Sequence, residues 1–338
     1  MKKSFALMMS LLLMGLLLTG SALAEGESIT LRLSNNQPDG NVTTQACEWF
    51  AEQVNERTDG RITIQVYNNG TLGDAVSCLE QAQYGGMDIV KADLSTMTNF
   101  VDEYNALMMP FIYEDLEHFW AVHGGEVGMG ILRGEEMEKV GLYGLTYYDA
   151  GSRCFFSSKP IHSPEDMKGM LVRVQESELM MSMVEALGAS SIAIAYAECY
   201  SSLQTGVCDA AENSIVNYLD MSFYEVAPYY IKDDHTMSAD ILVMSAKTRE
   251  KLSEEDLAII DEVALESWEY QKELWAEAEQ LNEQTLLDTG KVEIYTPTEE
   301  EKAAFRDACT PIWYSYEDGK YADLVDQIKA AAPSAQAE

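Results

Sequence analysis

Residues 151–174 read GSRCFFSSKPIHSPEDMKGMLVRV and alternate an apolar run, a short polar stretch and a second apolar run. The apolar runs predict strands over residues 153–157 and 170–174. Between them Ser163 is an N-cap candidate, a proline occupies the first helical position, and Asp166 completes the pattern of a capping box. A strand, a helix and a strand in this order indicate an α/β fold.

The same alternation occurs nearer the N-terminus. Residues 29–33, 61–67 and 87–92 are three short apolar runs with strand character. Two helical patterns separate them, one with apolar residues four apart from Val42 to Val54 and one that follows Asp74, a candidate N-cap. This order predicts a parallel sheet covered by helices.

A much longer helix is predicted to begin after Ser253 and to end at Gly290. Three acidic residues follow the N-cap, where the helix dipole favours negative charge, and an apolar stripe continues to Leu281. Helices in globular proteins average about 11–12 residues, so a helix of this length is expected to span two lobes. Residues 331–338 have the composition of a flexible tail.

Composition and charge limit the classes of protein. The chain has 338 residues, of which 47% are apolar, and this length indicates about two domains or lobes. Lys and Arg number 22 against 57 Asp and Glu, for a net charge of -35. Nucleic acid and anionic lipid are therefore excluded as partners, because both require concentrated positive charge.

Residues 1–24 have the pattern of a secretory signal peptide. Two lysines precede an apolar run over residues 7–18, and Ala22–Ala24 form the small-x-small site that favours cleavage before Glu25. No later apolar run reaches the ~20 residues of a membrane span. The sequence therefore predicts an exported, periplasmic protein that does not cross the membrane.

The cysteine pattern leaves two interpretations open. Export permits disulfides, and an even number of cysteines fits them, with Cys199 and Cys208 as the favoured pair. The alternative is that the cysteines are buried free thiols, and the sequence does not assign the connectivity. Their wide spacing, without a CxxC pair, argues against zinc. The six are Cys47, Cys78, Cys154, Cys199, Cys208 and Cys309.

Motifs of catalysis and of cofactor binding are missing. The sequence contains no GxSxG, HExxH or phosphate-loop pattern, and its four histidines are not spaced as metal ligands. We therefore expect no enzyme activity, no cofactor and no metal. An exported α/β enzyme that acts on a small carboxylate, or a ligand-binding sensory surface protein, remains as an alternative.

Basic residues are scarce, so an arginine within a strand is notable. Arg173 lies in the run LVRV, and the alternation of a strand places it on one face with Leu171 and Gln175. It is either a solvated or ion-paired strand residue, or the planar fork that binds a carboxylate with two hydrogen bonds. Arg153 has the same two interpretations. Asn213 is either a helix cap or turn residue, or a donor to a carboxylate.

Ten short motifs, in one order along the chain, resemble the DctP-type solute-binding proteins of TRAP (tripartite ATP-independent periplasmic) transporters. They are the runs NGTLGD (69–74), MPF (109–111), GSR (151–153), KPI (159–161), SPEDMKG (163–169), VRV (172–174), EALGA (185–189), LQTGVCD (203–209), EN (212–213) and FYEV (223–226). The resemblance covers nearly all of the chain after the signal peptide. Ser190-Ser191 and Ser214 depart from the family pattern, which leaves the identity of the ligand open.

The resemblance implies a periplasmic-binding-protein-like fold, with two α/β lobes joined by a hinge and a ligand cleft between them. One lobe would comprise residues 25–150 and 239–278, and the other residues 151–238 and 279–330. The chain would cross between the lobes near residues 150 and 238, and the long helix would contact both lobes.

The resemblance also implies a function and a set of binding residues. The protein would capture a small organic acid, such as a sugar acid or a C4-dicarboxylate, and deliver it as a monomer to the membrane subunits of a TRAP permease. Arg173 corresponds to the carboxylate-binding arginine of the family, Arg153 to a frequent second arginine, and Asn213 to an asparagine that helps to hold the carboxylate. Further cleft contacts are implied for Asp93, Tyr196, Asn35, Asn36 and Asp74.

Overall fold

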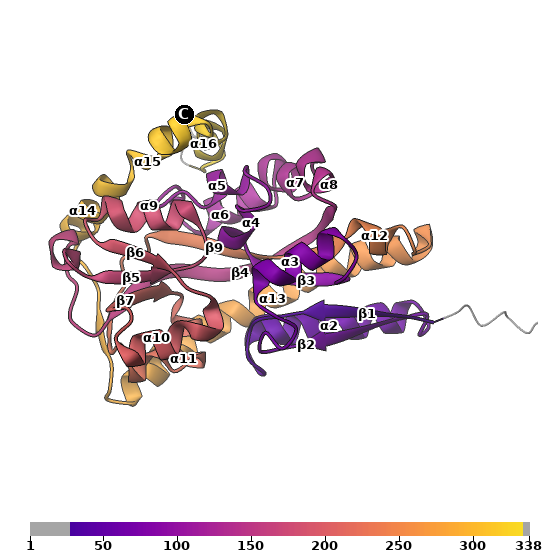
Figure 1. Cartoon of the computed structure of the whole chain (residues 1–338), viewed down its shortest axis with the longest axis horizontal. Helices are drawn as coiled ribbons and strands as arrows, with labels where there is room; N and C mark the ends of the chain where they lie inside the picture. The colour runs from indigo at the N-terminus through magenta and orange to yellow at the C-terminus, as the bar shows by residue number, and fades with distance from the viewer. Residues whose placement is uncertain (1–27, 334–338) are drawn as a thin grey trace, which may run out of the picture.

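The computed structural model describes residues 28–333, which form two α/β lobes with one long helix running along both (Figure 1). The expected signal peptide, residues 1–24, and its cleavage position before Glu25 lie outside the described residues. Of the expected tail, residues 331–333 are described, and Ala332 among them is buried.

Strands and helices alternate along most of the chain. The strands are β1 (Ile29–Ser34), β2 (Ile62–Tyr67), β3 (Ile89–Asp93), β4 (Leu142–Ser157), β5 (Leu171–Val174), β6 (Ser190–Ala193), β7 (Ala210–Asn213), β8 (Tyr229–Ile231), β9 (Thr236–Ser245) and β10 (Glu293–Tyr295). The α-helices are α2 (Val42–Arg57), α3 (Ala75–Gln83), α4 (Leu94–Met97), α5 (Tyr104–Leu107), α6 (Leu116–His123), α7 (Glu126–Leu132), α8 (Glu135–Lys139), α9 (Glu178–Ala186), α10 (Cys199–Thr205), α11 (Ile215–Asp220), α12 (Ala246–Arg249), α13 (Glu254–Asp288), α14 (Glu299–Cys309), α15 (Ile312–Ser315) and α16 (Ala322–Ala330). The short 3-10 helices are η1 (Pro164–Met167), η2 (Tyr196–Glu198), η3 (Phe223–Glu225) and η4 (Tyr316–Gly319).

The strands pair in the order β2-β1-β3-β9-β4-β7-β5-β6, and β8 adds to β4 and β10. Within each lobe the predicted parallel pairing is correct, since β1 is parallel to β2 and β3, and β5 is parallel to β6 and β7. The complete sheet is mixed, because β9 is antiparallel to β3 and β4, and β4 is antiparallel to β7. The reason is that β4 and β9 run between the lobes in opposite directions.

Strand β4 contributes to both lobes. Its first part, to Arg153, pairs with β9, and its last part, from Cys154, pairs with β7. The pairing with β9 shifts register between Asp149 and Ser152, and Gly151 there has a φ of +72°. A Cβ at Gly151 would lie 2.9 Å from Glu279 Oε1 and 3.0 Å from Trp275 Nε1, so only glycine fits between the crossing strand and the long helix.

Helix α13 packs on α2, on β4 and on α11, so the prediction of a helix that contacts both lobes is confirmed. Its N-cap is Ser253, whose hydroxyl accepts from Asp256 N at 3.1 Å. The helix has 35 residues and is about 52 Å long at 1.5 Å per residue. Among the described helices, none combines the length and apolar character that crossing a membrane requires.

All six cysteines are free and buried, so the interpretation as buried free thiols is confirmed and the alternative Cys199–Cys208 disulfide is wrong. Both residues belong to the apolar cluster that contains Phe156, Tyr218 and Phe223. They pack there as small apolar side chains. Burial raises the pKa of Cys208 to about 11, which keeps its thiol protonated and unreactive at neutral pH.

Candidate functional site

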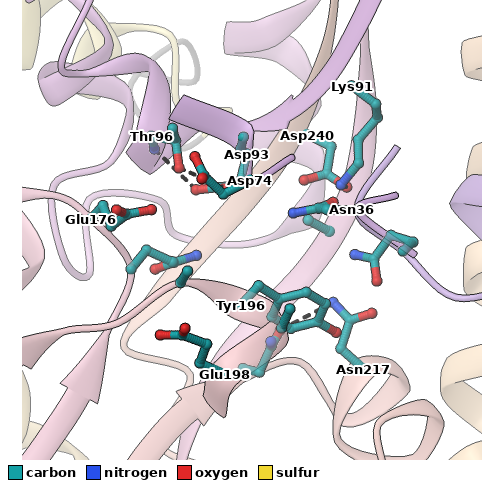
Figure 2. A pocket seen from close by; sticks show the side chains of 18 of the residues that line it. Asn36, Asp74, Lys91, Asp93, Thr96, Glu176, Tyr196, Glu198, Asn217 and Asp240 are labelled. Carbon is teal, nitrogen blue, oxygen red and sulfur yellow. Dashed lines mark hydrogen bonds and ion pairs between the residues drawn. The ribbon is translucent and has the colours of Figure 1, made fainter. Parts of the chain in front are cut away.

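A cavity of about 210 Å³ lies between the two lobes (Figure 2). It opens where several strands end, which is the usual position of a ligand site in an α/β sheet. Asp93 is the last residue of β3 and Asn213 is the last residue of β7, while Arg173 lies near the end of β5. Arg153 and Asp240 line the cavity from the crossing strands β4 and β9. The cavity therefore contacts both lobes and the segments that join them.

Arg173 is a buried cation that forms no direct ion pair among the described residues. Its side chain lines the cavity, yet the residue is only 1% exposed. Nε and Nη2 both donate to the carbonyl oxygen of Ile194, at 2.9 and 2.6 Å. Among residues 28–333, no carboxylate lies within 4.0 Å of it. A buried charge without a counter-ion is strongly unfavourable, and an anion bound in the cavity would compensate it.

Arg153 also lines the cavity, but its charge is already paired. Its Nε donates to Glu212 Oε2, and its Nη2 donates at 2.9 Å to both Glu212 Oε1 and the Glu212 carbonyl. Nη1 donates to Asn213 Oδ1 at 3.3 Å. Arg153 and Arg173 thus contribute to one cavity, as the sequence predicts. They differ in that Arg153 forms an ion pair with Glu212, whereas Arg173 forms no direct ion pair among the described residues.

The Arg153–Glu212 ion pair is part of a buried cluster of charged groups that extends behind the cavity. His235 Nε2 lies 3.6 Å from Glu212 Oε2, and its Nδ1 lies 2.8 Å from Asp233 Oδ2. Burial favours the neutral carboxyl of Glu212, but Arg153 and His235 outweigh it and lower its pKa to about 2. Burial likewise opposes the charge of His235, but Asp233 and Glu212 raise its pKa to about 9. Glu212 is therefore ionised, and His235 is protonated at neutral pH.

Two of the predicted acids line the cavity and also begin helices. Asp93 caps α4, accepting from Thr96 N at 3.0 Å and from Thr96 Oγ1 at 2.9 Å. Asp74 caps α3, accepting from Ser77 N at 2.8 Å and from its hydroxyl at 2.9 Å. Partial burial opposes ionisation of Asp74, but the bonds from Ser77 lower its pKa. Both carboxylates are held in place by the helices that they begin.

The predicted turn at Asn35 and Asn36 is placed only partly at the cavity. Asn35 does not line the cavity. Its amide nitrogen instead donates to Thr44 Oγ1 at 2.8 Å and to Asn68 Oδ1 at 3.1 Å. Asn36 and the next residue, Gln37, do line it. Asn36 Oδ1 and Gln37 Oε1 are buried acceptors without a partner among the described residues.

Tyr196 and Asn213, the remaining predicted residues, both line the cavity. The hydroxyl of Tyr196 is buried without a hydrogen-bond partner among the described residues, and burial raises its pKa well above the ordinary value. Asn213 Oδ1 accepts from Arg153 Nη1 at 3.3 Å, from Ser214 N at 2.8 Å and from Asn217 Nδ2 at 3.1 Å. Tyr196 can therefore still bond a ligand, whereas the oxygen of Asn213 is fully used.

Sequence reasoning missed several residues of the cavity wall. Lys91 and Asp240 form a buried ion pair with 2.9 Å between Nζ and Oδ2, and no local motif joins residues so far apart in the chain. Gln175 was detectable, since it shares the strand face of Arg173. With its amide oxygen toward Arg153, Gln175 accepts from Nη1 at 2.9 Å and from Nη2 at 3.0 Å. No group of three or more metal-ligating side chains occurs among residues 28–333.

The arrangement of two lobes, a cavity between them and a buried cation facing it defines a solute-binding protein. The family model for bacterial extracellular solute-binding proteins, family 7 (DctP), matches residues 33–319, and the chain belongs to this family. The family is one of binding proteins rather than of enzymes, and it is the periplasmic component of TRAP transporters.

Individual relatives support the assignment over most of the chain. A solute-binding protein of Chromohalobacter salexigens is 31% identical over 322 residues, which is 94% of each chain. The structure of a TRAP periplasmic solute-binding protein of Bradyrhizobium sp. with galacturonate is 34% identical, with a TM-score of 0.85 over 89% of this chain and 99% of that one. The structure of a TRAP protein of Sulfurospirillum deleyianum with succinate is 27% identical, with a TM-score of 0.85 over 89% and 98%.

The buried cluster predicts a pH dependence of stability. His235 has a pKa of about 9 in the folded chain against an ordinary value of 6.5, so its contribution is fully present below pH 6.5 and is lost as the pH rises through 9. We expect the free energy of unfolding of the wild type to fall by roughly 1–3 kcal/mol between pH 6 and 9, and that of His235→Gln to change less. Urea unfolding at several pH values measures this.

The exposed His162→Gln variant is the control for this experiment, and it should keep the wild-type pH dependence. Equal pH dependence of the wild type and of His235→Gln would show that His235 is not held protonated by its acidic neighbours.

Proposed function

We propose that the cavity binds a small monocarboxylic acid rich in hydroxyl groups, a sugar acid, and that Arg173 binds its carboxylate. The observation that carries the proposal is the charge of Arg173, which is buried and forms no direct ion pair among the described residues. The carbonyl of Ile194 holds one side of the guanidinium, so the remaining N–H groups meet the ligand in a fixed orientation. A planar fork of this kind suits a carboxylate.

The charge balance of the cavity wall favours one carboxylate over two. Of the cations that line it, Arg153 is paired with Glu212 and Lys91 with Asp240, which leaves Arg173 as the one without a direct ion pair among the described residues. Glu176 of the same wall acts on it only at longer range. A second ligand carboxylate would have no free cation to meet. It would also approach acids of the same wall, among them Glu176 and Glu198.

Hydroxyl donors, in contrast, match the remaining polar groups. Asn36 Oδ1 and Gln37 Oε1 are buried acceptors with no partner among the described residues, and Glu176 is a half-buried carboxylate of the wall. Burial, with Asp74 and Asp93 nearby, raises the pKa of Glu176. Buried acceptors are stabilised by donors, and the hydroxyl groups of a sugar ring supply them. The galacturonate in the Bradyrhizobium structure supports this ligand class.

Each predicted binding residue has a distinct role in the proposal. Arg173 and Tyr196 contact the ligand directly, while Arg153 and Asn213 support the wall beside them. Asp93, Asp74 and Asn36 line the cavity as hydrogen-bond acceptors, and Asn35 orders the turn from behind. The lobes, divided near residues 150 and 238, close around the ligand about β4 and β9, and the closed monomer delivers it to a TRAP permease.

The ligand class is tested by calorimetry with the mature chain. We expect galacturonate or glucuronate to bind at least about tenfold more tightly than succinate, because leaving one carboxylate unpaired in a low-dielectric cavity costs more than the ~1.4 kcal/mol that corresponds to tenfold. Tighter binding of succinate would contradict the charge balance and would favour a dicarboxylate.

Arg173 is tested by substitution. Arg173→Ala should reduce the affinity for the best sugar acid by ~2–5 kcal/mol, the range for breaking a buried charge pair. Arg173→Lys should recover little of it, since an ammonium lacks the planar fork. Arg32→Ala, at an exposed arginine of β1 paired with Asp88, is the control and should bind normally. Normal binding by Arg173→Ala would show that the carboxylate site lies elsewhere. Wild-type affinity in Arg173→Lys would exclude bidentate recognition by the arginine.

We further propose that the chain is exported and cleaved before Glu25. The charged start, the apolar run and the Ala-Leu-Ala site of residues 1–24 support this. Mass spectrometry of the protein recovered from the periplasm of an expressing bacterium should show a chain that begins at Glu25. A mature chain that keeps the apolar run would instead indicate an N-terminal membrane anchor.

A further inference from the structure

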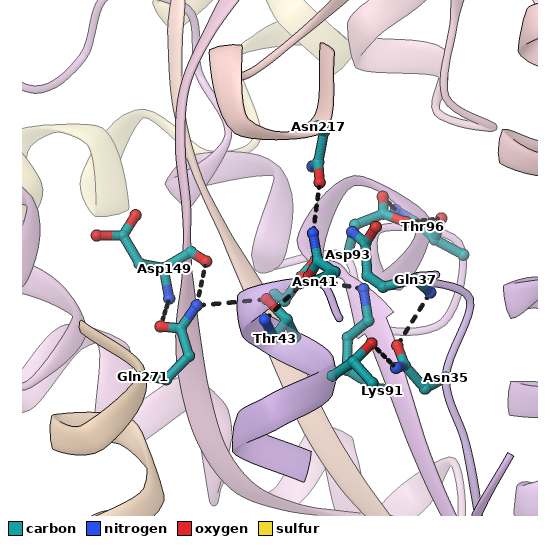
Figure 3. Close-up of polar contacts among 12 residues, drawn as sticks. Asn35, Gln37, Asn41, Thr43, Lys91, Asp93, Thr96, Asp149, Asn217 and Gln271 are labelled. Carbon is teal, nitrogen blue, oxygen red and sulfur yellow. Dashed lines mark hydrogen bonds and ion pairs between the residues drawn. The ribbon is translucent and has the colours of Figure 1, made fainter. Parts of the chain in front are cut away.

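The two lobes touch through side chains beside the cavity as well as around it. Asn41, which precedes α2 in the first lobe, donates from Nδ2 to Asn217 Oδ1 at 3.3 Å, as Figure 3 shows. The same nitrogen donates to Asp220 Oδ2 at 2.8 Å. Asp220 and Asn217 belong to α11 in the second lobe. Neither Asn41 nor Asp220 lines the cavity. The bond to Asp220 therefore joins the lobes outside the cavity wall, whereas Asn217 also lines the cavity.

Asn41 is held firmly in this position. Its residue is 2% exposed, and its side-chain oxygen accepts from Thr43 N at 2.9 Å as the N-cap of α2. The oxygen thus serves the helix of its own lobe while the nitrogen reaches the other lobe. The acceptor is a carboxylate, so the bond to Asp220 is charge-assisted and stronger than a bond between neutral groups.

The partners of Asn41 are connected to the residues beside the ligand. Asn217 Nδ2 donates to Asn213 Oδ1 at 3.1 Å, and Arg153 Nη1 donates to the same oxygen at 3.3 Å. Asn217 and Asn213 both line the cavity. A chain of hydrogen bonds therefore runs from Arg153 to Asn41, and rotation of one lobe away from the other breaks it at Asn41.

Two other contacts beside the cleft join neutral groups. Asn99 Nδ2 donates to the carbonyl of Glu176 at 2.6 Å, and the hydroxyls of Thr98 and Ser177 lie 3.4 Å apart. These bonds join neutral groups, whereas the acceptor on Asp220 is a carboxylate, on an exposed residue at the end of α11. Partial burial of the carboxyl raises the pKa of Asp220, and the bond from Asn41 opposes that rise.

We propose that Asn41 and Asp220 form a closure latch, a pair that exists only while the lobes are together and so increases ligand affinity without touching the ligand. The proposal rests on the proposed capture by lobe closure. A ligand selects the closed state by its own contacts there, and any bond between the lobes that is confined to that state adds to its apparent affinity. Asn41 is thus a positioning residue for the closed cavity.

The variant Asn41→Asp tests the latch while preserving the helix. Aspartate is as good an N-cap as asparagine, so α2 keeps its first turn. The new carboxylate cannot donate to Asp220 and repels it only when the lobes are closed. We expect the affinity for galacturonate or glucuronate, whichever the wild type binds more tightly, to fall about tenfold or more. The free energy of unfolding of the ligand-free chain should not fall correspondingly.

A second substitution should restore the latch with its polarity reversed. In Asn41→Asp/Asp220→Asn the amide of residue 220 can donate to the carboxylate of residue 41, so affinity should return to within about threefold of the wild type. Gln45→Glu, on an exposed position of the same helix, adds an equal charge away from Asp220 and is the matched control. It should change affinity less than about threefold.

Small-angle scattering separates the latch from a local effect on the ligand. At saturating ligand the wild type should be more compact than its free form, and Asn41→Asp should be less compact than the liganded wild type or need more ligand to reach the same compactness. Wild-type affinity in Asn41→Asp, an equal loss in Gln45→Glu, or no recovery in the double variant would overturn the latch. If the wild type binds no sugar acid at all, the proposed ligand class fails instead.

Discussion

The bidentate ion pair between Arg153 and Glu212 is the interaction on which the rest of the site depends. It joins the crossing strand β4 to β7 of the second lobe, because the register places Phe155 opposite Glu212 and Cys154 opposite Asn213. Both side chains are buried, and His235 supplies a second positive charge from behind. Since Glu212 satisfies Arg153, the charge that the cavity offers a ligand is that of Arg173. An isolated arginine at the position of Arg153 would make the same cavity suitable for a dianion.

An acidic protein that binds an anion requires short-range forces to outweigh long-range repulsion. The chain has a net charge of -35, but exposed charges are screened over ~8 Å at physiological salt, whereas a buried pair is screened much less. Arg173 is 1% exposed, so the interaction with a carboxylate that we propose for it would take place where the effective dielectric is low. The acids Glu176 and Glu198 of the same wall repel more highly charged ligands. In the proposed function, the wall therefore selects for low charge and for hydroxyl donors.

Much of the fold follows from local sequence patterns, and the misses have physical causes. The strand and helix around Ser163, and the long helix after Ser253, were predictable because caps and periodicity are local signals. The first part of β4, from Leu142, is buried on both faces and shows no alternation of apolar and polar residues, so the sequence pattern does not indicate a strand there.

Antiparallel pairing of β4 with β9 depends on contacts between distant segments, which local sequence patterns do not reveal. The Lys91–Asp240 ion pair could not be predicted for the same reason. The position of Asn35 behind the cavity depends on its hydrogen bond to Thr44, and no sequence motif indicates that bond.

The strength of a single bond between the lobes decides what such a bond can do. A hydrogen bond to a charged group contributes about 1.5–3 kcal/mol, whereas moving an equilibrium from 1:99 to 99:1 requires about 5.5 kcal/mol. The bond from Asn41 to Asp220 is thus too weak to hold the free protein closed, and strong enough to improve retention of a ligand that already favours closure. A charged donor at position 41 would attract Asp220 over a longer range and would also favour closure without ligand. An amide acts only in contact, so in the proposed latch it would assist capture and still allow the lobes to separate.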